Sequence, residues 1–226
     1  PIEEVFLEAR ADDDYGVASL DLVYSVNGGA EDTLRLYRSD APPLREVSAG
    51  HTLFLEEWEL VPGDVLAYYA VARDGDRVLG AKNAVSDLFF VTIRPFRKDF
   101  SAADSRGGGG GGGGGGAQGG PQSSLVEIQR QIVSATFNLV RDRGMKDSEE
   151  WRTDVVSVAL SQKNLRDQVA RLVEQIETRL GSRGDETFRT VAEELPRAVE
   201  AMDSAAVRLD AVEVREALSP EQTALL

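Results

Sequence analysis

The sequence predicts an α+β protein built from two modules, an all-β sandwich at residues 1–100 and an all-α segment at residues 123–226. Apolar side chains recur at every second residue in the first part of the chain, and at every third or fourth residue in the last part. Ten consecutive glycines, Gly107 to Gly116, separate the two patterns. The length of 226 residues is enough for two modules that each bury a core.

The clearest strand pattern lies at residues 18–26, where apolar residues such as Leu20 and Leu22 alternate with more polar ones. This period of two places one apolar face inward. Asn27-Gly28-Gly29 follows and predicts a hairpin turn, because Asn and Gly tolerate positive φ. About six or seven short strands in some hundred residues are typical of a β-sandwich. The other strands that we expect lie at residues 5–9, 33–37, 52–56, 65–71 and 88–93.

Several segments of this first module carry a resemblance. They are residues 11–17 (ADDDYGV), residues 22–24 (LVY), and residues 60–64 (LVPGD) leading to residues 68–74 (YYAVARD). With these segments, residues 1–96 resemble the immunoglobulin-like and fibronectin-III-like modules of bacterial surface proteins. Leu-x-Pro-Gly followed by a strand Tyr is similar to the tyrosine-corner region of those sandwiches. The resemblance implies a fold, and it implies no particular ligand.

Residues 101–122 are rich in Gly, Ser and Ala and predict a flexible linker. Such a segment buries too little apolar surface to offset the entropy of ordering its backbone. At about 5–6 Å × √n, its root-mean-square reach is roughly 25 Å. The two modules are therefore expected to be tethered closely without needing to pack on each other. A glycine-rich phosphate-binding loop would need a preceding strand and a placed Lys, which this tract lacks.

Three helical stretches are predicted after the linker. Ser124 to Glu127 is a capping box that begins the first, and Gly144 ends it. Asp147 with Glu150 begins the second, and Asp185 begins the third. The apolar positions of the second and third stretches advance in alternating steps of three and four residues, as in a heptad seam. The second seam is Trp151, Val155, Val158, Gln162, Leu165, Val169, Leu172 and Ile176, and the third is Phe188, Val191, Leu195, Ala198, Met202, Ala205, Leu209 and Val212.

These two seams leave two arrangements open. The helices form a hairpin or bundle within the chain, or they form a coiled coil with another chain. Short loops favour the arrangement within the chain. Trp151, at the start of a seam, is expected to be a buried anchor. Pro196 interrupts the third stretch, which predicts a kink near Ala192 or a break into two helices.

The last residues carry another helix-start signature, with Ser219 at the N-cap, Pro220 in the first turn and Gln222 three residues after the cap. A helix that begins there is too short to be stable alone, so the helical segment is expected to continue beyond residue 226. The chain shows neither a signal-peptide pattern nor an apolar run long enough to cross a bilayer. A membrane anchor is therefore expected only outside these residues.

The composition excludes several classes of site. The chain holds 39 Asp and Glu against 25 Lys and Arg, for a net charge of −14, which argues against a nucleic-acid partner. It has no cysteine and one histidine, His51, which excludes disulfides, thiolate zinc sites and sites that need two histidines. A catalytic triad of His51 with Ser48 or Ser86 lacks the Gly-x-Ser-x-Gly turn. The sequence therefore predicts no enzyme, no catalytic residue and no cofactor.

Two acidic clusters are candidates for a metal site. They are Asp12 to Asp14, and Asp74 with Asp76. If the sandwich brought them to one end, their carboxylates could offer Ca²⁺ the oxygen ligands that it prefers. The spacing lacks the twelve-residue calcium-binding loop, and Asp commonly bonds its own backbone in turns. We therefore expect turn-forming residues and assign no metal site.

Trp58, Tyr68 and Tyr69 are the aromatic residues that a carbohydrate-binding sandwich would display. Consecutive residues of a strand point to opposite faces, and packing is the expected use of these rings. Residues 94–100 (RPFRKDF) mix three cations with two Phe residues. They could contact an anionic membrane surface, although we expect the Phe residues to cover the open end of the sandwich.

The order of sandwich, glycine tract and heptad helices resembles a group of large uncharacterised, membrane-anchored bacterial envelope proteins. The resemblance implies a place in the bacterial cell envelope, on its periplasmic or extracytoplasmic side. We expect a non-catalytic structural or protein-interaction segment, which binds protein partners or self-associates through its heptad seams. The alternative is a module that binds carbohydrate or Ca²⁺ at the loop ends of the sandwich.

Overall fold

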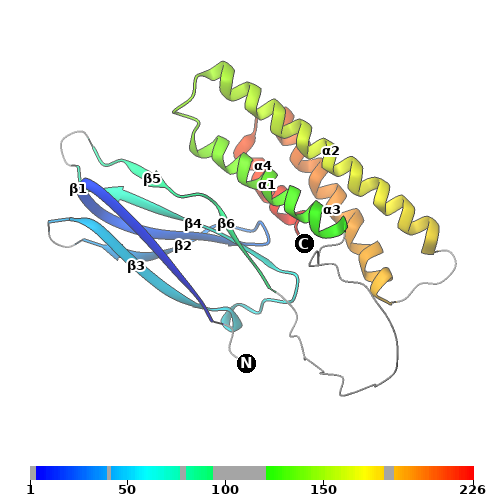
Figure 1. Ribbon diagram of the computed structural model, residues 1–226, viewed down its shortest axis with the longest axis horizontal. Helices are drawn as coiled ribbons and strands as arrows, with labels where there is room; N and C mark the ends of the chain where they lie inside the picture. Colours follow the sequence, from blue (N-terminus) through cyan, green and yellow to red (C-terminus); the bar gives the residue numbers. More distant parts are fainter. Residues whose placement is uncertain (1–3, 40–41, 77–79, 94–120, 181–185) are drawn as a thin grey trace, which may run out of the picture.

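The computed structural model describes residues 4–39, 42–76, 80–93, 121–180 and 186–226. A six-stranded antiparallel sheet is joined to four helices, which confirms the α+β class (Figure 1). The strands are β1 (Glu4–Val26), β2 (Asp32–Arg38), β3 (Leu44–Phe54), β4 (Val65–Asp74), β5 (Asn83–Val85) and β6 (Phe89–Thr92), with a short 3₁₀ helix, η1 (Leu55–Trp58), after β3. The helices are α1 (Pro121–Arg141), α2 (Ser148–Leu180), α3 (Glu186–Asp210) and α4 (Val214–Thr223).

Strand β1 organises the sheet, because its two halves pair with different strands. Its second half, from Val17 to Val26, pairs with β2 and with β4, and β4 in turn pairs with β5 and β6. Its first half, from Glu4 to Asp12, pairs with β3 and forms a two-stranded ribbon. The strands predicted at residues 5–9 and 18–26 are thus one continuous strand of 23 residues.

The β1–β3 ribbon packs over one face of the rest of the sheet. Ala9 and Val47 of the ribbon cluster with Leu20 and Ala70 of β1 and β4, and a second cluster joins Leu53 to Leu66. Neighbouring residues of a strand point to opposite faces. Because Leu66 and Ala70 point towards the ribbon, Val65, Ala67 and Tyr69 of β4 line the opposite face.

The helices form a bundle whose core holds the second seam. Trp151 is 5% exposed, which confirms the predicted anchor, and its indole Nε1 donates a hydrogen bond of 2.9 Å to Leu139 O of α1. Val155 and Leu165 are buried within the chain beside residues of α1, α3 and α4. The bundle therefore buries the central part of this seam without a second chain.

The third and fourth helices depart from the prediction. Of the kink or break predicted at Pro196, the break does not occur, because α3 runs through Pro196 to Asp210. An interior proline costs a helix about 3 kcal/mol or more, and the burial of Met202 and Ala205 in the following turns offsets this cost. Helix α4 begins at Val214, so the predicted start at Ser219 and Pro220 is wrong.

The error at α4 has a local cause. Ser219 does not cap the helix, because its hydroxyl donates a hydrogen bond to the carbonyl of Gly28 in the β1–β2 turn. Val212, with φ +63°, makes the turn that ends α3, and Val214 and Ala217 then bury the first turns of α4 in the bundle. Two strand predictions were also incomplete. β3 begins at Leu44 rather than near Thr52, and β5 was not expected.

Candidate functional site

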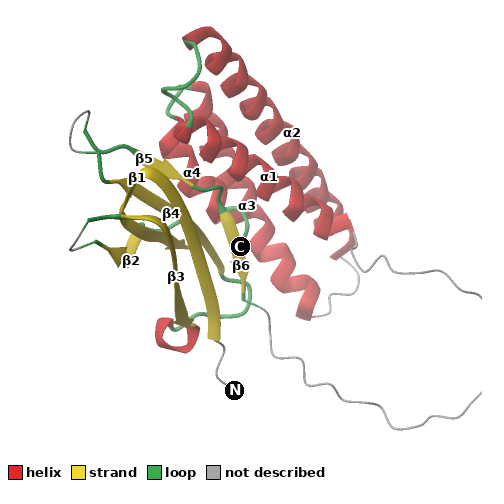
Figure 2. Ribbon diagram, turned by 60° about the vertical axis from the view of Figure 1, so that its left-hand side comes forward, coloured by secondary structure: helices red, strands yellow, loops and turns green. Residues whose placement is uncertain are grey.

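The sheet and the helices meet in a shared apolar layer. Val65 and Ala67 of β4 and Leu88 form one buried cluster with Val133, Phe137 and Leu225 of the helical part. The rings of Tyr69 and Phe137 lie 4.8 Å apart. Figure 2 shows the helices on one side of the sheet, with α1 and α4 nearest to it. The sequence left open whether the two halves pack on each other, and the structure shows that they do, through this buried cluster.

The predicted hairpin turn after β1 is the docking point of α4. Ser219 Oγ donates a hydrogen bond of 2.5 Å to Gly28 O, and Thr223 Oγ1 donates one of 3.3 Å to Asn27 O. Gly28 has φ +70°, and a Cβ added there would lie 2.4 Å from Ser219 O. Glycine is thus required at this position both for the turn and for the approach of α4.

Buried polar side chains form hydrogen bonds between the helices beside this junction, and one such bond joins a helix to the sheet. Glu221 of α4 has no exposed surface, and its Oε1 accepts a hydrogen bond of 2.8 Å from Thr136 Oγ1 of α1. Gln129 donates a bond of 2.8 Å to the backbone oxygen of Glu221, and it exchanges amide hydrogen bonds of 3.1 and 3.3 Å with Gln162 of α2. Ser25 of β1 donates to Gln222 Oε1 at 3.0 Å. The network links α1, α2, α4 and the sheet.

The Glu221 carboxyl is the unusual member of this network. Its second oxygen, Oε2, has no hydrogen-bond partner in the part of the chain that the structure describes. Burial raises the pKa of Glu221 well above its ordinary value, and the hydrogen bond from Thr136 opposes this rise. The carboxyl is therefore held in its neutral form over a range of pH in which an exposed glutamate is charged.

Two arginines of α1 form polar contacts with the sheet at the edge of the sheet–helix junction. Arg141 of α1 pairs with Asp87, between β5 and β6, at 2.7 Å, and this pair and its bond to Asp142 raise the pKa of the guanidinium. Arg130 Nη2 donates a hydrogen bond of 2.5 Å to Thr92 of β6. These contacts fix α1 against the edge of the sheet.

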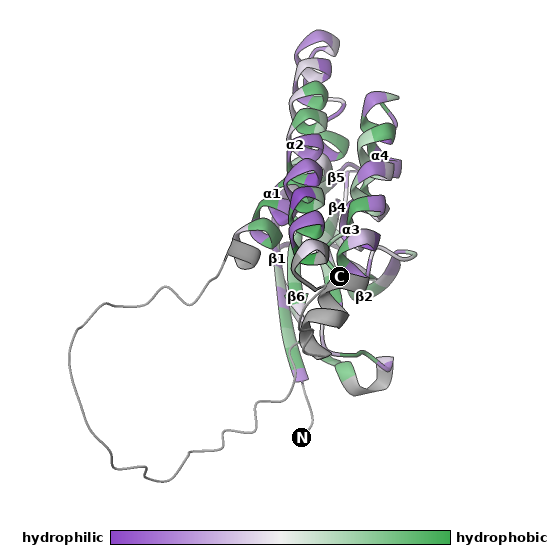
Figure 3. Cartoon of the chain, turned by 90° about the vertical axis from the view of Figure 1, so that its right-hand side faces the viewer, coloured by the Kyte–Doolittle hydropathy of each residue, from purple (hydrophilic) through white to green (hydrophobic). Residues whose placement is uncertain are grey.

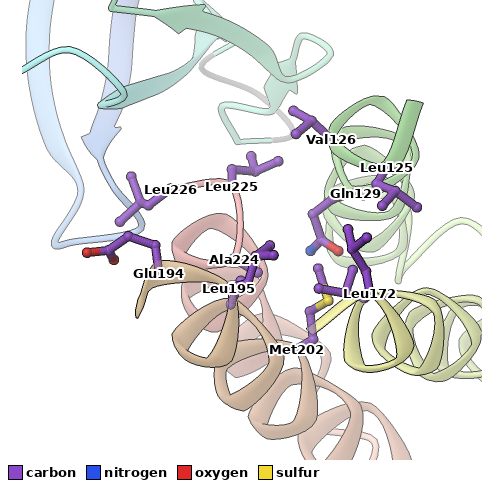
Figure 4. Close-up of a pocket in the computed structure, with 12 residues that line it drawn as sticks. Leu125, Val126, Gln129, Leu172, Glu194, Leu195, Met202, Ala224, Leu225 and Leu226 are labelled. Carbon is purple, nitrogen blue, oxygen red and sulfur yellow. The ribbon is translucent and has the colours of Figure 1, made fainter. Parts of the chain in front are cut away.

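The candidate functional site is an apolar groove beside the junction (Figure 4). We call it the apolar groove. Its volume is about 230 Å³. Residues of α1, α2, α3 and of the segment after α4 form its walls, so each wall comes from a different part of the bundle. The lining residues are Leu125, Val126, Gln129, Val169, Leu172, Glu194, Leu195, Ala198, Met202, Ala224, Leu225 and Leu226.

The lining of the groove is almost entirely apolar, and its two polar side chains already have partners within the protein. Gln129 is committed to the buried network, and Glu194 forms an ion pair of 3.0 Å with Arg197. Val126 and Leu226 remain partly open to solvent, at 39% and 52% exposure. Each helix alternates hydrophobic and hydrophilic segments (Figure 3), so the apolar lining is the inner side of amphipathic helices.

The two acidic clusters do come to one end of the sheet. Gly75 N donates a hydrogen bond of 2.7 Å to Gly16 O, which joins the two segments. Asp13 Oδ1 accepts a bond from Tyr15 N, and Asp74 Oδ1 accepts bonds from Asp76 N and Lys82 N. Within the described ranges, no group of three or more acidic or histidine side chains is arranged to hold a metal ion. These Asp carboxylates thus bond backbone N–H groups, as their turn chemistry predicts.

The residues weighed for a catalytic triad are not brought together. His51 lies on β3 opposite Leu7, whereas Ser48 lies three residues away and so points to the other face of the strand. Ser48 Oγ donates to Glu8 instead. Ser86 Oγ accepts a hydrogen bond from Ala70 N and donates one to Asp87 O.

The aromatic residues weighed for carbohydrate binding pack within the protein. Trp58 stacks on Tyr24 with ring centroids 4.9 Å apart, and Tyr68 stacks on Phe89 at 5.6 Å. Tyr69 faces Phe137, and its hydroxyl donates to Glu31 at 3.1 Å. Burial, together with Glu31, raises the pKa of Tyr69 to about 12. Residues 94–100 and most of the predicted linker lie outside the described residues.

The buried network was not predicted from the sequence. Gln162 was the one polar residue of its heptad seam, and this break in the pattern was a signal that a partner existed. Glu221 carried no such signal, because Ser-Pro-Glu-Gln matches a helix start, where an acidic residue is ordinarily exposed.

Among the described helices, none is long and apolar enough to cross a membrane. Comparison of the chain with protein-family models, with curated proteins and with solved structures found no match.

Proposed function

We propose that the chain is a non-catalytic protein-interaction segment of a bacterial cell-envelope protein, and that the apolar groove receives apolar side chains of a protein partner. The observation that carries the proposal is the groove itself, a partly open hollow whose lining is apolar apart from Gln129 and Glu194. Helix-in-groove recognition uses surfaces of this kind, into which an amphipathic helix inserts a few apolar anchors.

The size of the groove favours anchor side chains over a whole small molecule. Pockets for small molecules and cofactors measure about 300–1,000 Å³. The groove measures about 230 Å³, while a cavity of about 150 Å³ already accommodates benzene. It is therefore large enough for a few apolar side chains and small for a complete cofactor.

The shared core supports a role as a rigid unit. Because Phe137 and Leu225 pack against β4 and Ser25 of β1 bonds to Gln222, the groove keeps a fixed place relative to the sheet. The proposal confines the expected contacts to the end of the heptad seams that lines the groove, which includes Leu172 and Leu195. The other end of the second seam, with Trp151 and Val155, is buried within the chain. The immunoglobulin-like classification and the envelope location belong to the proposal, and the sequence resemblance and the ribbon packed over the sheet support them.

The test is a binding measurement with a labelled amphipathic helical peptide that carries leucines at positions i, i+3, i+4 and i+7. The unmodified chain is expected to raise the fluorescence anisotropy of the peptide. Val126→Arg, which places a charge in the groove, is expected to weaken binding by at least about tenfold, or 1.4 kcal/mol. Val207→Arg is the matched control, because Val207 is an exposed helical valine outside the groove. The absence of binding, or equal loss in both variants, would contradict the proposal.

The alternative function is the binding of carbohydrate or Ca²⁺ by the loop ends of the sheet. The observation that favours it is the meeting of the two acidic segments at Gly16 and Gly75. Calcium at millimolar concentration would then raise the melting temperature of the chain, and an oligosaccharide array would give positive spots. An unchanged melting curve and an empty array would remove this alternative.

A further inference from the structure

The segment from Val214 to Leu226 has two structural roles. Its helix, α4, contributes Ala217 to the bundle core, and Leu225, just after the helix, packs in the sheet–helix junction. Its last residues, Ala224 to Leu226, form one wall of the apolar groove (Figure 4). We call residues 214–226 the C-terminal segment. Its docking completes the junction and the groove together.

A carboxyl group lies at the centre of this docking contact. Glu221 is fully buried between α4 and α1, and its only side-chain partner among the described residues is the hydroxyl of Thr136. The other carboxylate oxygen accepts no hydrogen bond there. An ionised carboxylate at this position loses its hydration and gains no cation in exchange.

Among the described residues, no charged group forms an ion pair or a hydrogen bond with the Glu221 carboxyl. Burial and the Thr136 hydroxyl, and no charged group, determine the direction in which the pKa of Glu221 shifts. On α4 itself, Arg215 and Glu216 are exposed. The remaining charges and their contacts are Arg130 with Thr92, Arg141 with Asp87 and Asp142, Arg208 with Glu213, Lys163 with Asp210, and Glu31 with Tyr69.

We propose that the C-terminal segment is a detachable element, which docks on α1 and the sheet only while the Glu221 carboxyl is neutral. A rise in pH that ionises Glu221 releases the segment. The release does not depend on the proposed function, whereas its functional consequence, the loss of one wall of the apolar groove and of partner binding there, rests on it.

The direction of the pH dependence follows from linkage. The docked state binds the proton of Glu221 more tightly than the undocked state, in which the side chain is exposed and its pKa is the ordinary one of a glutamate. The contribution of Glu221 to docking is therefore fully present below the ordinary pKa. It falls as the pH rises towards the raised pKa of the docked state. Alkaline conditions therefore favour the undocked C-terminal segment, and mildly acidic conditions favour the docked one.

Hydrogen–deuterium exchange of the full chain, read by mass spectrometry, tests the proposal at about pH 5, 7 and 9 after correction for intrinsic exchange rates. Protection of residues 214–226 is expected to fall by at least about tenfold across this range. Protection of residues 32–38 in β2, which pack on other strands and not on the C-terminal segment, is expected to stay constant. The single histidine, His51, lies on the β1–β3 ribbon, away from this contact.

Two variants isolate the carboxyl. Glu221→Gln cannot ionise, so protection of the segment is expected to be independent of pH. Glu216→Gln removes an exposed carboxylate from the same helix and is expected to behave as the unmodified chain does. If Glu221→Gln does not fold, Glu221→Leu supplies a neutral side chain of similar size.

The proposal would be overturned if protection of residues 214–226 in the unmodified chain did not change with pH. It would also be overturned if this protection fell with pH as much in Glu221→Gln as in the unmodified chain. The exchange measurement needs no partner, so its failure leaves the peptide-binding test of the groove unaffected. Conversely, a chain that shows the pH-dependent exchange and binds no peptide at pH 5 contradicts the groove function alone.

Discussion

The hydroxyl of Thr136 on α1 donates a hydrogen bond of 2.8 Å to the carboxyl of Glu221 on α4, and both side chains are completely buried. This bond is the only side-chain hydrogen bond of that carboxyl among the described residues. It therefore joins the last helix to the first at a point that water does not reach.

Replacement of Thr136 by Val keeps the shape of the side chain and removes the donor. Leaving a buried polar group without its partner costs about 1–3 kcal/mol, so the free energy of unfolding is expected to fall by that amount. Thr153→Val is the matched control, because Thr153 is exposed and bonds only within α2; its effect is expected to stay within about 0.5 kcal/mol. Urea unfolding followed by circular dichroism measures both, and equal effects would contradict the assigned role of Thr136.

Gln129 and Gln162 are expected to be energetically coupled. Gln129→Leu and Gln162→Leu each leave a buried amide without its partner, at about 1–3 kcal/mol. The double variant leaves no unpaired amide between the two positions, so its loss is expected to be smaller than the sum by about 0.5–3 kcal/mol. A double-mutant cycle in urea gives the coupling energy, and strict additivity would show that the amide pair contributes nothing.

Gly28→Ala is expected to disturb α4 as well as the turn. The added Cβ would lie 2.4 Å from Ser219 O, so α4 must move away from the sheet. Gly63→Ala is the control, since Gly63 also has positive φ, +110°, but open space around it. Strain of the backbone costs both variants about 1–3 kcal/mol. Only Gly28→Ala is expected to accelerate amide exchange in residues 214–226; the same change in Gly63→Ala would contradict the docking geometry.

Trp151→Phe is expected to lower the free energy of unfolding by about 1–3 kcal/mol. The substitution preserves most of the ring packing and removes the hydrogen bond from the indole to Leu139 O. Trp151→Ala, which also leaves a cavity, is expected to cost about 3–5 kcal/mol. Thermal or urea unfolding measures the series, and a loss in the Phe variant equal to that in the Ala variant would show that the indole N–H accounts for the whole effect.

The elements that the sequence predicted well depend on local patterns. Leu20 and Leu22 lie in a strand and Trp151 and Val155 in a buried seam, because alternation and heptad spacing are determined by neighbours in the chain. β3 was predicted short, since between Leu44 and Gly50 only Val47 is a buried apolar residue. Its pairing with β1, rather than its own pattern, makes that part a strand.

The features that the sequence did not predict depend on partners far along the chain. Ser219 acts on Gly28 and not on its own helix, so no local rule could assign it. Glu221 is buried because α1 and α4 pack together around it, and its own neighbours along the chain are polar. The apolar groove has the same origin, since its walls come from α1, α2, α3 and the C-terminal segment.

The hydrogen bond between Ser219 and Gly28 spans 191 residues, which has a consequence for biosynthesis. At about 5–20 residues per second, a ribosome needs roughly 10–40 s to proceed from one partner to the other. For most of this interval Val65 and Ala67 of β4 have been made, while Leu225, which packs against them in the folded protein, has not. The nascent chain therefore exposes the apolar face of β4 before its partner has been made. A holding chaperone can bind this face and prevent aggregation.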